Sequence, residues 1–178
     1  MTVRILSGMR GVVTAIGSTC ILAMLLGTLS ITGAASARPA SQPAGHSLCM
    51  AGETRIFSCP LGAKQVSVCG AGKQAVYRYG RPGKIELVSR SMTLAEQGYS
   101  GGGETQIQVT NNGYSYILFD RTVRTGFGPD GRHDPAFSSG LLVRRGGRIL
   151  SSKRCGNDAS IPSLARQFMP TGNEIVVH

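Results

Sequence analysis

Residues 104–120 read ETQIQVTNNGYSYILFD, and they decide the fold class of this chain. Polar and apolar side chains alternate on both sides of Asn112-Gly113, which is the period of half-buried strands. Asn-Gly is the strongest short-range hairpin signal, because a type I′ turn needs positive φ at both central residues. A two-residue loop at this point pairs Ile107 with Leu118. The stretch therefore predicts an antiparallel β-hairpin.

Short strands separated by turn residues continue along most of the chain. Pro82-Gly83 suits a type II turn, and Gly146-Gly147 is expected to close another hairpin. We expect strands at about 54–59, 65–69, 74–79, 84–88, 104–110, 114–120, 140–145 and 148–152.

The C-terminal region is expected to add one short helix. Ser160 is a favourable cap, and Pro162 suits the first turn. Residues 175–177 are expected to form a last strand. Together the patterns predict a mainly β domain, an antiparallel sandwich or half-open barrel of about eight strands with one short C-terminal helix.

The first 37 residues have the three parts of a secretory signal peptide. Arg4 and Arg10 provide a basic start, and residues 11–32 are uncharged and mostly apolar. An A-x-A cleavage site follows and ends at Ala37. The alternative is an uncleaved membrane anchor, since the apolar stretch reaches the roughly 20 residues that a span needs. We expect cleavage near Ala37.

Removal of the signal leaves a length typical of one domain. Residues 38–48 are rich in Pro, Ala and Ser and are expected to be a flexible leader, and residues 49–178 a single disulfide-bonded β domain. The mature protein is expected in the periplasm or secreted, meeting a membrane only if the signal stays uncleaved. Its basic residues outnumber its acids, which favours a negatively charged partner or simply provides solubility.

The cysteines independently indicate an oxidising compartment. Of five cysteines, Cys20 lies in the signal, and the four that remain predict two disulfides. A zinc site is the alternative, but the spacings contain no C-x2-C pair and no nearby pair of histidines. We therefore expect no metal.

The register of the first predicted hairpin bears on the disulfide pairing. A two-residue turn at 62–63 places Cys69 opposite Ile56, so that Cys59 and Cys69 face opposite sides of the hairpin. Residues on opposite faces cannot form a disulfide. We therefore prefer Cys49–Cys69 with Cys59–Cys155 over the two other pairings.

Two predicted hairpin tips gather positive charge. They carry Arg81 and Lys84 at one turn, and Arg144, Arg145 and Arg148 at the other. Like charges placed opposite one another are destabilising, so the tips are candidates for binding phosphate, carboxylate or an acidic polymer. The alternative is a pair of solvated tips whose repulsion is screened within about 8 Å at physiological salt.

Two glycine-containing segments are candidates for contacting a partner protein. The first contributes Ser100, Gly101, Gly102 and Glu104. No Lys-Ser or Lys-Thr follows it, which disfavours a nucleotide-phosphate loop, and a plain connector entering a strand is the alternative. The second is residues 121–139, expected to be a long polar loop in which Phe127 and His133 are the binding candidates.

No catalytic constellation is evident in the sequence. It lacks the G-x-S-x-G and H-E-x-x-H patterns, and His133-Asp134 has no third partner that the sequence identifies. Glu86 and Glu104 are expected on solvent faces of strands rather than in an acid/base pair. We expect a non-enzymatic protein without a cofactor. Nucleic acid is not expected as a partner, since few aromatic residues lie among the charges.

A set of motifs runs from Cys49 to Tyr116. They are Gly52-Glu53, Phe57-Ser58-Cys59, Val66-Ser67-Val68-Cys69, Tyr77-Arg78-Tyr79-Gly80 and Ser100-Gly101-Gly102-Gly103. With these motifs the chain resembles a group of small exported proteins of Gram-negative bacteria, mostly uncharacterised. More distantly it resembles the periplasmic lysozyme inhibitors.

The resemblance implies a β scaffold whose loops enter the cleft of a lysozyme. One such loop has a Ser-Gly-x-x-Tyr pattern, which is Ser100-Gly101 here, with Glu104 in the place of Tyr. The expected function is an exported binding domain that inhibits a lysozyme-like glycosidase. The alternative is a cell-envelope module that binds anionic polymers through the basic hairpin tips.

Overall fold

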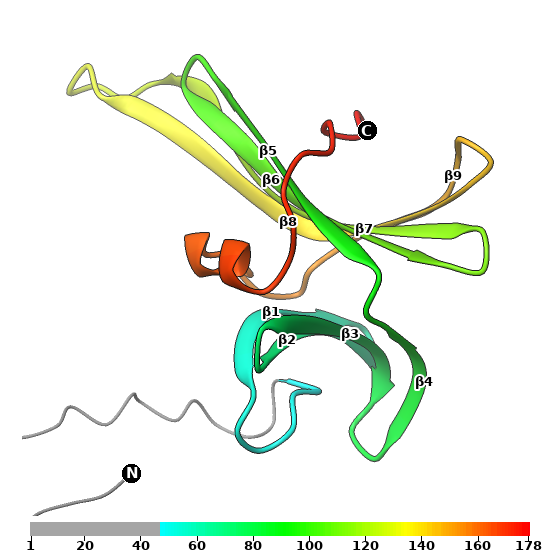
Figure 1. Ribbon diagram of the computed structural model, residues 1–178. Helices are drawn as coiled ribbons and strands as arrows, with labels where there is room; N and C mark the ends of the chain where they lie inside the picture. Colours follow the sequence, from blue (N-terminus) through cyan, green and yellow to red (C-terminus); the bar gives the residue numbers. More distant parts are fainter. Residues whose placement is uncertain (1–46) are drawn as a thin grey trace, which may run out of the picture. The chain divides into compact units, whose positions relative to one another are not determined.

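The structure is a computed structural model that describes residues 47–178, so the expected signal peptide lies outside the described residues. The described part contains nine β-strands in two antiparallel sheets (Figure 1). The first sheet has the order β1-β2-β3-β4, with β1 at Thr54–Leu61, β2 at Lys64–Ala71, β3 at Gln74–Arg81 and β4 at Lys84–Ser89. The second has the order β5-β6-β7-β8-β9, with β5 at Met92–Tyr99, β6 at Gly102–Asn111, β7 at Tyr114–Phe127, β8 at His133–Arg145 and β9 at Arg148–Arg154.

The β6–β7 hairpin has the predicted register. Ile107 pairs with Leu118, and the turn residues Asn112 and Gly113 have φ of 48° and 77°. Positive φ at both central residues is the type I′ geometry, whose twist matches that of the flanking strands.

Strand β5 is an addition to the eight expected strands. Its sequence, MTLAEQGY, contains Ala, Glu, Gln and Gly, which are poor strand formers and gave no strand signal. The strand forms because it pairs along its whole length with β6, from Met92 opposite Val109 to Tyr99 opposite Gly102.

The prediction of a long loop at residues 121–139 is wrong. Strands β7 and β8 continue through this segment, with Thr122 opposite Phe137 and Phe127 opposite His133. A short turn joins them, in which the Gly128 amide donates to the carbonyl of Arg132 at 2.8 Å. The glycines and the two prolines of the segment indicated a loop, but they mark only the turn and an irregular stretch of the ladder.

One apolar core joins the two sheets, so the domain is a mainly β, antiparallel sandwich. The first sheet contributes Phe57, Val66, Val68 and Tyr77, and the second contributes Leu94, Ile107, Val109 and Leu118. Alternation along each strand places these residues on one face. Removal of this apolar surface from water is the main stabilising contribution to the fold.

The two disulfides have the pairing that the register favoured. Cys49–Cys69 ties the N-terminal segment to β2, and Cys59–Cys155 ties β1 to the residue that follows β9. The detail of the register differs, because a bulge in β1 places Cys69 opposite Arg55 rather than Ile56. The disulfides are consistent with an oxidising compartment.

The face of the first sheet away from the core is covered by residues 47–53. Arg78 lies on this face, buried, and donates from both terminal nitrogens to the Glu53 carboxylate at 2.6 and 2.8 Å. The Leu48 amide donates to the hydroxyl of Ser67 at 3.0 Å. This polar layer holds the segment against the sheet.

The expected C-terminal helix is only a 3₁₀ turn, η1, at Ser163–Gln167. Pro162 is its cap and no side chain caps it, so Ser160 does not have the expected role. Ala165 and Met169 are buried in the core between the sheets. Within residues 47–178, no helix is long and apolar enough to cross a membrane.

Residues 175–177 do not form the expected strand. Instead the tail lies on the outer face of the second sheet, where the Gln106 side chain bonds the backbone of Val176. The Gln106 amide donates to the Val176 carbonyl and its oxygen accepts from the Val176 amide, both at 2.9 Å. Ile117, Phe119 and Leu142 form a small apolar cluster there, against which Val176 packs.

Candidate binding site

Side chains from two hairpins meet at the end of the second sheet, at a place we call the distal cluster. Its members are Ser100 and Gly101 in the β5–β6 turn, Arg124 and Phe127 on β7, and His133 at the start of β8. Arg124 donates to the Ser100 hydroxyl at 3.1 Å, and its guanidinium lies 5.2 Å from the centroid of the Phe127 ring. The structure thus brings together most of the predicted partner-binding residues.

Gly101 allows this close approach. A Cβ atom at Gly101 would lie 2.6 Å from His133 Nε2 and 2.7 Å from Arg124 Cβ, and the residue has a φ of 83°. Both the conformation and the space therefore require glycine. A side chain here would displace Arg124 or His133 from the turn.

The β5–β6 turn is fastened to β7 by its neighbours. The Tyr99 hydroxyl contacts two carbonyls, those of Gly103 at 3.1 Å and Thr122 at 2.9 Å. A Cβ atom at Gly102 would lie 2.0 Å from the carbonyl oxygen of Thr122. Gly102 is therefore a packing residue that sets the distance between the turn and β7.

Aromatic side chains around the distal cluster are unusually open to solvent. Phe127 is 67% exposed and Phe137 is 69% exposed, although both lie in strands. Large exposed apolar groups gathered in one region are typical of an interaction surface. Both side chains are held by strands rather than by a flexible loop, so the surface is preorganised.

Glu104 does not belong to the distal cluster, and its expected place on a solvent face is wrong. It is buried, because the C-terminal tail covers it. Its carboxylate accepts from the Gln106 amide at 2.7 Å and contacts His178 Nε2 at 2.9 Å. Arg121 lies 3.8 Å from the same carboxylate. Glu104 therefore fastens the tail.

The two basic hairpin tips lie on different sheets. Arg81 and Lys84 face one another at the β3–β4 turn. Arg145 and Arg148 face one another at the β8–β9 turn, where Arg145 stacks 4.9 Å from the Tyr114 ring and donates to its hydroxyl. The tips provide positive charge, but each is a separate small surface.

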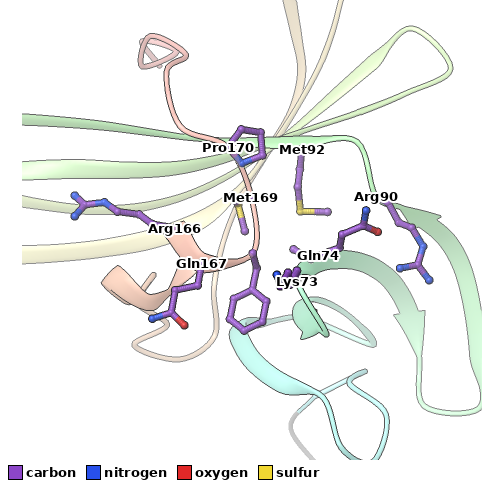
Figure 2. A pocket seen from close by; sticks show the side chains of 10 residues that line it. Lys73, Gln74, Arg90, Met92, Arg166, Gln167, Met169 and Pro170 are labelled. Carbon is purple, nitrogen blue, oxygen red and sulfur yellow. The ribbon is translucent and has the colours of Figure 1, made fainter. Parts of the chain in front are cut away.

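A third basic feature was not predicted. Three hollows of about 320, 490 and 560 Å³ share Arg90 in their linings, and we call them together the Arg90 groove. Figure 2 shows the first, where Arg90 and Arg166 lie on opposite sides of Lys73, Met92 and Met169. Among the described residues, no Asp or Glu side chain lines any of the three hollows.

Sequence reasoning missed Arg90 for a physical reason. It is a single exposed arginine in the two-residue link between β4 and β5, and a lone charge in a link has no motif. Its setting arises from segments distant in sequence. These are the β2–β3 hairpin, the β4–β5 link, the β6–β7 hairpin, β8 and the chain from η1 onward.

One group of possible metal ligands exists in the described residues, but it does not fit a metal. Cys49, Glu53 and Cys69 place ligand atoms within 4.8 Å of one another. The two sulfurs are joined in a disulfide, and the Glu53 carboxylate is engaged by Arg78. A metal needs deprotonated thiolates, which a disulfide does not supply.

No family model, curated protein or solved structure matches this chain.

Proposed function

We propose that this protein is an exported, non-enzymatic binding domain whose distal cluster docks into a partner protein, with a lysozyme-like glycosidase as the candidate partner. The observation that supports this is the convergence of Ser100, Arg124 and His133 beside the exposed ring of Phe127. A hydroxyl, a guanidinium and an imidazole at the tip of a rigid hairpin are suited to a concave partner.

The chemistry of a glycosidase cleft complements this set of groups. Most glycoside hydrolases hold two catalytic carboxylates across the bond that they break. The Arg124 guanidinium is suited to a carboxylate through charge-assisted hydrogen bonds. Phe127 would bury its exposed ring against the apolar wall of the cleft. The hairpin would thus occupy the place of the substrate.

Inhibition of cell-wall lysis tests this proposal. The disulfide-bonded domain, residues 38–178, is added to several classes of lysozyme acting on peptidoglycan. We expect inhibition of at least one class. Replacement Arg124→Gln should weaken inhibition about tenfold or more, the usual effect of losing a hydrogen bond to a charged group.

Arg132→Gln is the matched control. Arg132 is exposed in the turn of the same hairpin, and within residues 47–178 its only ion pair is with Asp130, at 3.6 Å. The replacement removes the same charge as Arg124→Gln without altering the distal cluster, so inhibition should be retained. If every lysozyme class stays fully active at a micromolar excess of the domain, the glycosidase proposal is wrong.

A second candidate function is binding of anionic envelope polymers through the basic hairpin tips. It is favoured by the β8–β9 hairpin, where no described cation forms an ion pair. These cations are Arg144, Arg145, Arg148, Lys153 and Arg154. Added salt separates the two candidates, because exposed charge contacts are screened far more than a desolvated contact.

A further inference from the structure

A row of hydroxyl groups crosses the outer face of the second sheet within the Arg90 groove. Thr110 pairs with Ser115 across β6 and β7, and Ser115 pairs with Arg144 across β7 and β8. At the other end, the Ser91 hydroxyl lies 2.9 Å from that of Thr110. Directly paired residues share one face of a sheet, so the four side chains form one continuous line.

A cation stands at each end of this row. Arg90 precedes Ser91 on the β5 side, and Arg144 is the last member on β8. Three strand spacings separate β5 from β8, which is a distance of ~14 Å. The row is therefore long enough for an extended molecule rather than for a single small anion.

Both arginines are available to a ligand. Arg90 is exposed, and it forms no ion pair with any residue in the 47–178 range. Arg144 is half-buried in the lining, where it donates to the Gly147 carbonyl at 3.0 Å and forms no ion pair with a described residue.

The wall of the groove is held in place before any ligand arrives. The Asn173 amide donates to both the Thr93 hydroxyl and the Gln108 side-chain oxygen. The Gln108 amide in turn donates to the carbonyl of Glu174 at 2.7 Å. These bonds fix the C-terminal tail as one side of the groove, and a preformed site loses less entropy on binding.

We propose that the Arg90 groove binds an acidic oligosaccharide, whose carboxylate groups pair with Arg90 and Arg144 and whose hydroxyls bond the row between them. Hydroxyl and amide side chains suit the many hydroxyls of a sugar, and guanidinium suits carboxylate. Absence of carboxylates from the lining removes the groups that would repel such a ligand. The site is separate from the distal cluster, and of the tip residues it includes only Arg144.

Binding of oligogalacturonate tests the proposal, with calorimetry on the disulfide-bonded domain. We expect binding that is lost when the carboxylates are methyl-esterified. Arg90→Gln and Arg144→Gln should each weaken binding about tenfold or more. Ser115→Leu changes no charge, but it replaces a hydroxyl of the row with a larger apolar side chain. It should therefore weaken binding as well.

Arg145→Gln and Arg148→Gln are the matched controls, since they remove the same charge at the adjacent tip outside the groove. They should bind like the wild type. Equal loss in the controls would overturn the proposal in favour of the tips. The proposal would also be overturned if oligogalacturonate does not bind, or if its methyl ester binds equally well. It would likewise be overturned if inorganic sulfate or single-stranded DNA binds as tightly as oligogalacturonate. Lysozyme inhibition is measured separately and does not depend on this result.

Discussion

Loss of the Glu53–Arg78 ion pair is expected to be the most damaging single change outside the apolar core. The side chains of Arg78 and Glu53 are 6% and 12% exposed, and two hydrogen bonds join them. Glu53 also accepts from the Met50 amide at 2.7 Å. Glu53→Gln removes the negative charge and leaves the Arg78 guanidinium buried without its counter-ion.

The expected loss of unfolding free energy is about 3–5 kcal/mol, which is typical when one partner of a buried ion pair is removed. Denaturant unfolding at pH 7 with both disulfides intact measures it. Glu86→Gln is the control, because the Lys64–Glu86 pair lies at the surface, and it should give no measurable change. A Glu53→Gln domain within about 1 kcal/mol of the wild type would refute the reasoning.

The dependence on pH gives an independent check. The hydrogen bond from Arg78 holds the pKa of Glu53 below its usual 4.5. A lowered pKa in the folded state stabilises the protein above the unfolded value, and that contribution is lost as the pH falls through the folded value. The difference between wild type and Glu53→Gln should therefore shrink below pH 4.5. Replacing both partners with leucine should recover much of the loss at pH 7, because no buried charge remains.

Three further changes have expected outcomes. Chain entropy predicts that removing the Cys59–Cys155 bond, which spans 96 residues, costs ~4.7 kcal/mol, against ~3.3 kcal/mol for the 20-residue Cys49–Cys69 bond. Denaturant unfolding of the two paired serine variants measures this difference, and the reverse order would contradict it. Gly101→Ala should abolish partner inhibition because the new Cβ displaces His133 and Arg124, whereas Gly98→Ala, which meets nothing within 4 Å, should leave it intact. Burial raises the pKa of Asp120 above 3.8, so its charge is destabilising at neutral pH and ceases to be so as the pH falls through the folded value. Asp120→Asn keeps an acceptor for the Ile161 amide, so the variant should be at least as stable as the wild type at pH 7. Unfolding midpoints measured across pH test this, and a lower midpoint for the variant at pH 7 would contradict it.

Local signals predicted the parts of the fold that depend on local chemistry. The Asn112-Gly113 turn fixed the register of β6 and β7, because turn geometry and strand alternation act within a few residues. Strand β5 was missed because its own residues do not favour a strand, and its pairing with β6 provides what they lack.

The functional surfaces depended on contacts between distant segments. Ser100 and His133 were separate candidates in the sequence, and only the packing of two hairpins brings both against Arg124. Glu104 seemed exposed, because nothing in its own strand indicates that the tail around Val176 returns to cover it. Arg90 had no motif at all, since its groove is assembled from segments that are remote in sequence.

The two disulfides differ in when they can close. On an N-terminus-first route across a membrane, Cys49 and Cys69 arrive together, and their bond can form while most of the chain is still inside. Cys59 must wait for Cys155, which lies 96 residues later and follows the last strand. During that interval Cys59 is an unpaired thiol that lies between two other cysteines in the sequence. Early closure of Cys49–Cys69 therefore protects the chain from mispairing, and the second bond joins the two sheets only after β9 has followed.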